Sequence, residues 1–530
     1  MAKVQIAKRR SMTLFALLAI AMVALSYLIV AAIAAACVYL PYDALASGRA
    51  ANFQILTLFV GGVVVAGAIL WSLVPRRLKF EAPGLLLGRD SHPKLFREID
   101  GIAAALGEPV PREVYLVGQV NAFVTDHGGV FGIGSRRVLG IGLPLLAVLN
   151  LSEFRALLAH EFAHYYGGDT RLGPWVYSAR SAMARTFENV GRIRDVGRIA
   201  IIQLLTSVVT VVLKWLFVFF MRVTNFVSRR QEYRADELAG IVAGRLPLAE
   251  SLRKIHGASM AWRPYWESEI ARALDENCLP PIAAGFAAFV AAPHIASQMT
   301  EGVAREILGG KSSPYDTHPP LKDRLEALAR HNEPKFDAAQ NNTDRQRPLN
   351  VQAETASAMS LFDGLESTEQ EFVELLNPKL RNTTLRRITW KEVPHEVTIR
   401  GWRASAAQIA APLEGITVAN LPDAISKLPA IGAQLRDPQG MLLSPDQRTS
   451  RAAGFLAQAL GLALVDSGWK LEDEPGIQRV CRDGKAISLG VVGEIWSGQI
   501  SREDWVARCD ELGITGLSLS SKSVGEAATN

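Results

Sequence analysis

The sequence predicts a mostly helical α+β protein, in which transmembrane helices precede a globular region with a small β-sheet and a further α+β domain. Three observations support this prediction. Two apolar runs near the N-terminus, Met12 to Leu40 and Phe53 to Val74, are each long enough to cross a bilayer. From about residue 80 the chain alternates helix-like and strand-like segments. Residues 160–164 are His-Glu-Phe-Ala-His within a helix-like segment.

The composition suits a membrane-anchored protein rather than a nucleic-acid-binding one. Hydrophobic residues make up 49% of the 530 residues, and the formal net charge is only +5. Basic residues gather beside the apolar runs and form no stripe interleaved with aromatic residues, so no nucleic-acid partner is expected. None of the four cysteines has a metal-binding spacing, and reduced thiols are expected at Cys37, Cys278, Cys481 and Cys509.

Positive charges beside the two apolar runs predict their orientation. Lys8, Arg9 and Arg10 precede the first run, and Arg76 and Arg77 follow the second. Because cytoplasmic flanks carry the excess of lysine and arginine, both flanks are expected in the cytoplasm. Residues 1–79 are therefore expected to form a two-helix anchor in the inner cell membrane, with the rest of a multi-pass chain facing the cytoplasm. A secretory signal is excluded because its apolar region is only about 7–15 residues long.

Short elements are expected within a globular domain at residues 80–332. Helical spacing predicts a helix at residues 92–107, and residues 113–118 predict a strand. Residues 130–134 and 138–142 are expected to pair as a hairpin, and Ser152 is expected to cap the helix with the two histidines. Residues 281–296 predict a buried helix rather than a span, because Pro293 and His294 interrupt the apolar run.

The C-terminal part is predicted to be a separate domain. Residues 333–365 are mainly polar and are expected to form a linker. Residues 366–530 are expected to form an α+β domain, in which strands at 386–393 and 396–402 pair and residues 486–496 form another strand. Helices are expected at 448–465 and at 501–513, the second capped by Ser501. Nothing in this domain indicates its role.

The spacing of His160 and His164 indicates a metal site. Histidines four residues apart lie on one face of a helix, so both imidazoles can reach one zinc ion at about 2.0–2.1 Å. Glu161 lies beside them, where it can take a proton from an activated water. The helix is otherwise apolar, and buried polar side chains need a partner such as a metal. The alternative is a helix that carries this pattern by chance.

A third ligand is expected because catalytic zinc sites combine three protein ligands with an open position. A third histidine at the spacing HExxHxxGxxH is excluded, because that position is Thr170. The helix-like segment 228–240 places Glu232 and Asp236 four residues apart. One carboxylate could bind the metal while the other accepts a hydrogen bond from a ligating histidine. The alternative is an ordinary solvated helix.

Taken together, residues 160–169 and 228–236 resemble the membrane zinc metalloproteases that include HtpX and the CAAX prenyl endopeptidase. Residues 92–107, 120–126 and 316–328 resemble segments of the same family, so the resemblance covers about residues 80–330. It implies a zincin-type, gluzincin fold with a small edge sheet. The C-terminal region lies outside the resemblance.

The resemblance also implies roles for individual residues. One Zn²⁺ per chain would be held by His160, His164 and Glu232. Glu161 would be the general base, Asp236 would support the ligands, and His318 would stabilise the transition state at the open side of the metal. An extended peptide would dock at or beside an edge strand formed by Asn121, Ala122 and Phe123.

A third apolar run, at residues 199–221, tests the proposed ligand set. A single crossing there would separate His164 from Glu232 by the whole bilayer. The run must therefore enter the membrane and return, lie along its surface, or pack inside the protein. Lys214 near its middle argues against simple exposure to lipid.

The predicted function is that of a membrane-bound zinc endopeptidase acting on membrane or misfolded proteins, in the manner of HtpX. Protein or peptide substrates and membrane lipid are the expected partners, and the sequence predicts no oligomeric state. The alternative is a catalytically inactive scaffold of the same fold that binds partners through its C-terminal domain.

Overall fold

The computed structural model describes most of the chain, namely residues 2–47, 53–74, 81–127, 136–165, 173–196, 199–309, 318–330, 355–378, 380, 384–435, 437 and 442–520. These residues form two compact units. The first comprises Met1–His256 and Gly302–Asp363, and the second comprises Gly257–Glu301 and Gly364–Asn530. Residues 257–301, expected within the globular domain at 80–332, thus group with the C-terminal region.

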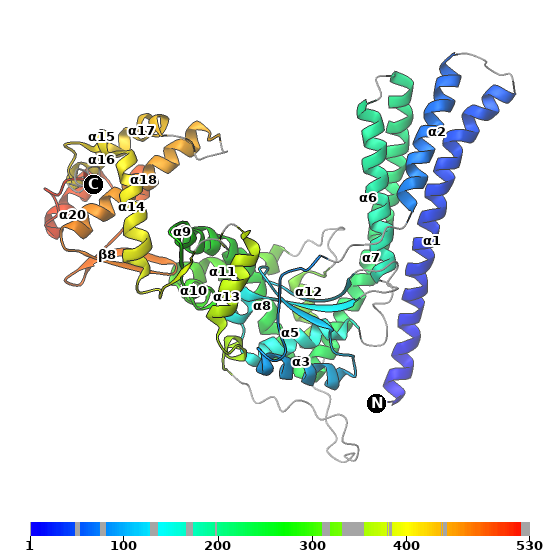
Figure 1. Cartoon of the computed structure of the whole chain (residues 1–530), viewed down its shortest axis with the longest axis horizontal. Helices are drawn as coiled ribbons and strands as arrows, with labels where there is room; N and C mark the ends of the chain where they lie inside the picture. Colours follow the sequence, from blue (N-terminus) through cyan, green and yellow to red (C-terminus); the bar gives the residue numbers. More distant parts are fainter. Residues whose placement is uncertain are drawn as a thin grey trace. The chain divides into compact units, whose positions relative to one another are not determined.

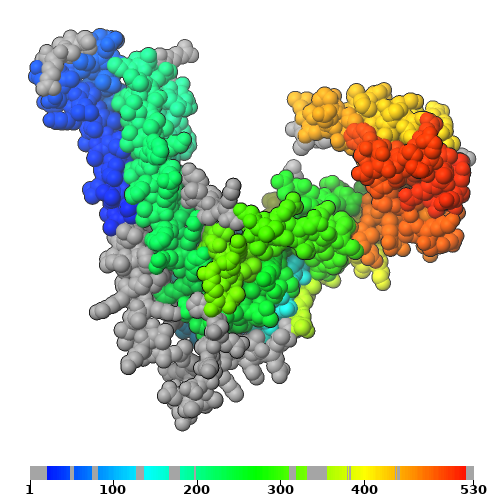
Figure 2. Space-filling model, turned by 180° about the vertical axis from the view of Figure 1, so that it is seen from behind, coloured from blue at the N-terminus to red at the C-terminus, as the bar shows by residue number. Residues whose placement is uncertain are grey.

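Four long helices of the first unit run side by side (Figure 1). They are α1 (Ala2–Ala46), α2 (Phe53–Leu73), α6 (Gly173–Val196) and α7 (Ala200–Ala243). Three contain segments long and apolar enough to cross a membrane, Ala21–Ala46, Phe53–Leu73 and Ala200–Ala243. The space-filling view in Figure 2 shows the blue column of α1 and α2 against the green column of α6 and α7.

Apolar side chains from all four helices share one core, which includes Val30, Val65, Val190 and Val209. Gly62 allows α1 and α2 to approach closely, since a Cβ atom there would lie 2.0 Å from the carbonyl oxygen of Cys37. Close approach at small residues is typical of packing between membrane helices. The four helices therefore form one bundle.

Helices α6 and α7 form an antiparallel pair. Arg180 donates hydrogen bonds to Thr224 Oγ1 at 3.2 Å and to Asn225 Oδ1 at 2.8 Å. Further along the pair, the rings of Phe187 and Phe217 are 5.8 Å apart. The chain thus runs out along α6 and returns along α7. The apolar run at 199–221 forms the first half of α7. The residues before and after the pair lie at the same end of the bundle, which removes the topological objection to the ligand set.

A four-stranded sheet lies beyond the bundle, with the order β1-β2-β4-β3. Its strands are β1 (Leu85–Leu86), β2 (Glu113–Val117), β3 (Ala122–His127) and β4 (Arg136–Gly142). Strand β4 is parallel to β2 and antiparallel to β3, so β3 is an edge strand. The strand expected at 113–118 is confirmed. Residues 130–134 of the expected hairpin lie outside the described residues, and residues 138–142 belong to β4, which pairs with β2 and β3.

Phe123 and Gly140 face each other across the β3–β4 pair. A Cβ atom on Gly140 would lie 2.4 Å from the Phe123 ring, so the ring occupies the space that a side chain would fill. The ring also packs against Tyr115, Val117 and Val138. Gly140 thus lets the aromatic side chain of the edge strand lie flat on the sheet.

Shorter helices complete the first unit and its borders. They are α3 (Pro93–Leu106), α4 (Leu143–Val148), α5 (Leu151–Ala163), α8 (Arg245–Tyr265), α11 (Pro293–Gly309) and α12 (Leu321–Arg330). Helix α3 confirms the helix expected at 92–107. Figure 1 shows α5 beside the sheet and near α3.

Helix α5 begins two residues earlier than expected. Asn150 Oδ1 accepts a hydrogen bond from the Glu153 amide at 2.8 Å, and Glu153 Oε2 accepts one from the Asn150 amide at 2.9 Å. The prediction that Ser152 caps this helix is therefore wrong. The residue three positions after Ser152 is Arg155, which cannot return such a bond, whereas Asn150 and Glu153 form a capping box.

Residues 355–363, expected to be part of a linker, lie against the first unit. The Leu151 amide donates to the Ala356 carbonyl at 2.9 Å, and the Ala358 amide donates to the Leu149 carbonyl at 3.0 Å. Lys94 forms an ion pair with Asp363 at 2.6 Å. The remainder of the expected linker, up to residue 354, lies outside the described residues.

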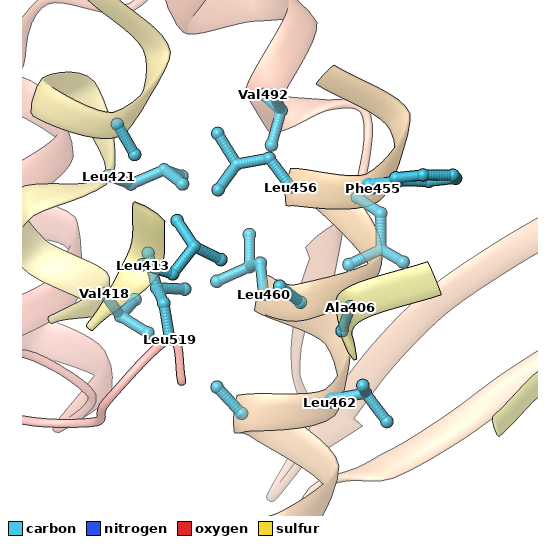
Figure 3. Close-up of a cluster of buried hydrophobic side chains, with 14 of the residues drawn as sticks. Ala406, Leu413, Val418, Leu421, Phe455, Leu456, Leu460, Leu462, Val492 and Leu519 are labelled. Carbon is cyan, nitrogen blue, oxygen red and sulfur yellow. The ribbon is translucent and has the colours of Figure 1, made fainter. Parts of the chain in front are cut away.

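The second unit is built around α18 (Pro445–Asp466). Leu456 and Leu460 of this helix are fully buried with Leu413, Val418 and Leu421, as Figure 3 shows. The other helices are α9 (Ala271–Asp275), α10 (Ile282–Ala291), α13 (Leu365–Leu376), α14 (Ile399–Gln408), α15 (Ala410–Leu413), α16 (Leu421–Ser426), α17 (Leu428–Gln434), α19 (Val491–Trp496) and α20 (Arg502–Leu512).

The strands of the second unit form two small sheets. Strands β5 (Cys278–Leu279) and β6 (Arg386–Arg387) pair in parallel, and β7 (Lys470–Glu474), β8 (Ile477–Arg482) and β9 (Lys485–Ser488) form an antiparallel sheet. The expected α+β character is present, and α18 and α20 confirm two predicted helices. The Ser501 cap is also confirmed, since its side chain accepts a bond from the Asp504 amide.

The strand expected at 396–402 is wrong, because these residues are helical. A π-helical turn at Pro394–Thr398 continues directly into α14. Val397, Trp402 and Ala406 are buried on one side of this continuous helix. Their helical spacing allows packing against the core, which outweighs the strand preference of a short apolar run. Residues 491–496, expected as strand, form α19 for the same reason.

Helix α10 is the buried helix that the interrupted run at 281–296 predicts. Ile282, Phe286 and Phe289 are buried, and the Glu369 carboxylate caps the helix from α13. It accepts hydrogen bonds from the Ile282 amide at 2.8 Å and the Ala283 amide at 2.7 Å. This buried carboxylate satisfies two amide groups that the first turn of a helix leaves without partners.

Candidate metal centre

Three potential metal ligands meet where α5 packs against α7. His160 lies on α5, His164 ends that helix, and Glu232 lies on the half of α7 that follows the apolar run. The Nε2 atoms of the two histidines are 3.2 Å apart. Glu232 Oε2 lies 3.5 Å from His160 Nε2, and Glu232 Oε1 lies 3.5 Å from His164 Nε2. The two segments singled out in the sequence are thus brought together.

The three ligand atoms have the spacing of a tetrahedral zinc site. With zinc–ligand bonds of about 2.0–2.1 Å, the ligand atoms of a tetrahedron lie about 3.3 Å from one another. The observed separations of 3.2 to 3.5 Å match this value. Glu232 Oε2 is buried and accepts no hydrogen bond from any described residue. A cation between the three side chains would satisfy this oxygen, so the residues fit a metal.

Asp236 holds the far side of the His160 ring. His160 Nδ1 lies 2.9 Å from Asp236 Oδ1. Asp236 also accepts hydrogen bonds from Arg324, at 2.9 Å from Nε and 2.6 Å from the terminal nitrogen. All three side chains are buried. With Nδ1 bonded to a carboxylate, Nε2 of His160 is left to face Glu232 and His164, as the ligand role requires.

The pKa values of the two histidines are shifted in opposite directions. Burial alone lowers the pKa of His160, but the neighbouring carboxylates of Asp236 and Glu232 outweigh burial and raise the pKa to about 9. Burial and the neighbouring His160 lower the pKa of His164 to about 4. At neutral pH His160 therefore carries a proton, whereas the imidazole of His164 stays neutral. A neutral imidazole is the form that binds a metal.

Glu161 lies beside the three ligands with a free carboxyl group. It makes no hydrogen bond to any described residue, and it interacts electrostatically with His160, Glu232 and His318. Burial raises the pKa of Glu161 to about 7. A carboxyl group that titrates near neutral pH can both accept and return a proton.

His318 reaches the site from the turn before α12. Its Nδ1 atom lies 3.0 Å from Glu232 Oε1, while its side chain is 66% exposed. The hydrogen bond to Glu232 raises the pKa of His318. It thus approaches the ligand cluster from solvent, on the side where a substrate would enter.

The segment at Asn121, Ala122 and Phe123 lies at the sheet edge. Ala122 and Phe123 begin β3, and the exposed Asn121 precedes them, with its carbonyl accepting a bond from the Gly142 amide at 2.9 Å. Tyr165, next to His164, donates its hydroxyl hydrogen bond to the Val124 carbonyl at 3.0 Å. This bond links the edge strand to the end of the helix that carries the histidines.

The sequence analysis gave Arg324 no role, although it noted the segment that contains it. Arg324 is 6% exposed and joins α12 to the ligand-bearing part of α7. The signal was present in the spacing, because Leu321, Arg324 and Leu328 share one face of α12 and all three are buried. An arginine on the apolar face of a short helix requires a buried carboxylate partner.

Comparisons with known proteins agree with this geometry. The family model "Peptidase family M48" matches residues 90–332. A "Protease HtpX homolog" of Streptococcus uberis is 24% identical over 53% of this chain and 91% of its own length. A homolog of the same name from Limosilactobacillus fermentum is 25% identical over 45% of this chain and 73% of its own length. One from Methanopyrus kandleri is 28% identical over 43% and 62%.

No solved structure matches the chain. The matched region begins after β1, contains the other three strands of the sheet and all the candidate ligands, and ends just after α12. It agrees with the resemblance found in the sequence at about residues 80–330. Residues 90–332 of the chain are therefore similar to peptidase family M48, and the chain resembles the HtpX-like membrane metalloproteases.

Proposed function

We propose that the protein is a zinc-dependent endopeptidase that hydrolyses peptide bonds of membrane or misfolded proteins at the cytoplasmic face of the inner membrane. The observation that carries this proposal is the mutual spacing of His160, His164 and Glu232, with the free carboxyl group of Glu161 beside them. The three ligand atoms all lie within 4.8 Å of one another. An inactive scaffold would have no need of this complete set.

The three ligands would hold one Zn²⁺ ion per chain. Bound zinc supplies a Lewis acid that activates water and polarises a carbonyl group. Glu161 takes the proton of the attacking water and returns it to the leaving amine, for which its pKa near 7 is suited. His318, on the exposed side, donates a hydrogen bond to the oxyanion that forms on the substrate. Asp236 keeps His160 oriented throughout.

The substrate would bind as an additional strand beside β3. On its outer side β3 has no partner strand among the described residues, and Tyr165 ties β3 to the end of α5. Asn121, Ala122 and Phe123 lie at the start of this edge. Since main-chain hydrogen bonds would supply most of the binding, we expect a loose sequence preference.

The bundle supports a cytoplasmic orientation. The basic residues in the first turns of α1 and after α2 favour the cytoplasm for both ends of this pair. The antiparallel pair of α6 and α7 starts and ends on the same side, so Glu232 would lie on the cytoplasmic side as well.

The test uses the full-length protein purified in detergent. We expect about one zinc ion per chain, casein cleavage that stops after chelation, and recovery when zinc is added back. Glu161→Gln should lower cleavage by about 10²–10⁴-fold while zinc remains bound. Glu326→Gln, on the exposed face of α12, is the matched control and should cleave normally. Normal cleavage by Glu161→Gln would exclude the protease role and favour a scaffold.

A further inference from the structure

The outward face of α6 carries charged side chains within the helix bundle. Glu188 and Arg192 form an ion pair one turn apart, and their side chains are 59% and 72% exposed. Arg194 and Asp195 form a second pair at 3.4 Å and are also exposed. The exposed side chains of α2, by contrast, include the apolar residues Val60, Val64, Leu70 and Trp71.

The pairing of α6 with α7 gives the depth of these charges. Phe187 faces Phe217, so Arg192 lies level with about residue 212 of α7. That level is about 15 Å from Arg222 and about 18 Å from the start of α7. Ile193, next to Arg192, lines an apolar cavity with Val60 and Val64 of α2. Arg192 therefore lies near the middle of a hydrocarbon layer about 30 Å thick.

Charged groups at this depth do not face lipid. Intramembrane ionisable side chains face the interior of a bundle, a water-filled cavity or another protein. Arg180 and Arg185 of α6 follow this rule, because Arg180 bonds to Thr224 and Asn225, and Arg185 donates to the Ser72 carbonyl at 3.0 Å. Glu188 and Arg192 point away from the other three helices. Among the described residues Glu188 and Arg192 pair with each other, and their exposed sides need surroundings that the described part of the chain does not supply.

We propose that the outward face of α6 is an interface between two copies of this chain in the membrane. Glu188 of each copy pairs with Arg192 of the other across a two-fold axis along the membrane normal. The two positions differ by about 6 Å along the helix axis, a height that an arginine side chain can bridge. Ser181 and Ala184 share this face and leave room for the helices to approach.

Charge complementarity favours a second copy over a different partner. A two-fold interface uses the same patch on both copies, so the patch must complement itself. Glu188 and Arg192 supply one charge of each sign. Asp195, seven residues after Glu188, lies on the same face of α6. A face of a single sign would repel its own copy. This inference concerns assembly and does not depend on the proposed reaction.

Cysteine cross-linking in native membranes tests this interface. In a chain whose four cysteines are replaced by alanine, Ala184→Cys is placed on the proposed face. Leu204→Cys, on the lipid-facing side of α7 and 65% exposed, is the matched control. Oxidation with copper phenanthroline should give a band of twice the chain's mass for Ala184→Cys alone. Absence of this band, equal yield from the control, or a band of another mass would each overturn the proposal.

Charge exchange provides a second test that does not rely on the same variant. Copies with Glu188→Arg present two positive charges, and copies with Arg192→Glu present two negative charges. Each variant alone should lose co-purification of differently tagged copies by about tenfold, whereas the two variants expressed together should recover it. Zinc content of each variant checks that the fold is intact. Folded variants that self-associate normally, or that fail to recover when mixed, would refute the pairing.

Discussion

Nδ1 of His160 lies 2.9 Å from Oδ1 of Asp236, one helical turn beyond Glu232 on α7. The same carboxylate receives two hydrogen bonds from Arg324 on α12. Three helices therefore contribute to the orientation of one imidazole ring. Substitution of Asp236 and substitution of Arg324 should therefore have separate effects that can be measured.

Asp236→Asn should weaken zinc binding by about 10–100-fold, because the amide holds the His160 ring less firmly and does not increase its basicity. Competition with a fluorescent chelator measures the affinity. Asp323→Asn, an exposed position on α12, should bind zinc as the parent does. Equal affinities for all three proteins would show that Asp236 has no part in holding the ligand.

Arg324→Ala should lower the free energy of unfolding by about 3–5 kcal/mol, because it leaves the buried Asp236 carboxylate without its cation. Urea unfolding in detergent, followed by loss of bound zinc, measures the change. Arg330→Ala removes a pair whose arginine is 73% exposed, and should cost less than about 1 kcal/mol. Similar values for the two variants would contradict the role given to Arg324.

Gly140→Ala should destabilise the sheet by about 1–3 kcal/mol, because its new methyl group would overlap the Phe123 ring. Adding Phe123→Ala removes the overlap and should recover part of the loss. Gly101→Ala is the contrasting control, since a Cβ atom there meets nothing within 4 Å inside α3. That variant should be stabilised by about 0.5–1 kcal/mol. Thermal unfolding of the three proteins tests the order.

Stability of the second unit should fall as pH rises from about 4.5 to about 7. Burial raises the pKa of Glu369 from 4.5 to about 7, so in this window the folded chain keeps a proton that the unfolded chain releases. Stability is then highest below pH 4.5 and decreases by roughly 2–3 kcal/mol across the window. Hydrogen exchange of the α10 amides measures it. Glu369→Gln should remove the slope and the exposed Glu371→Gln should keep it; a slope retained by Glu369→Gln would assign it elsewhere.

The ligand set could be predicted because its chemistry is local in the sequence. The spacing of His160 to His164, and of Glu232 to Asp236, places each pair on one helical face whatever the rest of the fold. Their meeting depends on the antiparallel run of α6 and α7, which the charges on α6 obscured. Arg180 and Arg185 indicate a solvated helix when read singly, but within the bundle they bond to α7 and α2.

Other errors came from packing that a single sequence does not display. Ser152 and Asn150 are both acceptable helix caps, and only the reciprocal bond to Glu153 decides between them. Residues 396–402 have strand-like composition, yet Val397 is buried against Ala273 and Cys278 while Trp402 is buried against α18, which requires a helix. Residues 355–363 look like a linker, but their backbone bonds to residues 149–151 attach them to the first unit.

Helix α7 is continuous from its apolar half to Glu232. The eleven residues from Met221 to Glu232 correspond to about 16 Å of rise along the helix. This continuous helix therefore limits the height of Glu232 above the lipid surface to about that distance. An extended polypeptide emerging from the bilayer needs about five residues to cover that distance. The proposed endopeptidase would therefore cut tails and loops that protrude by about this distance, and peptide bonds close to the lipid surface would be out of its reach.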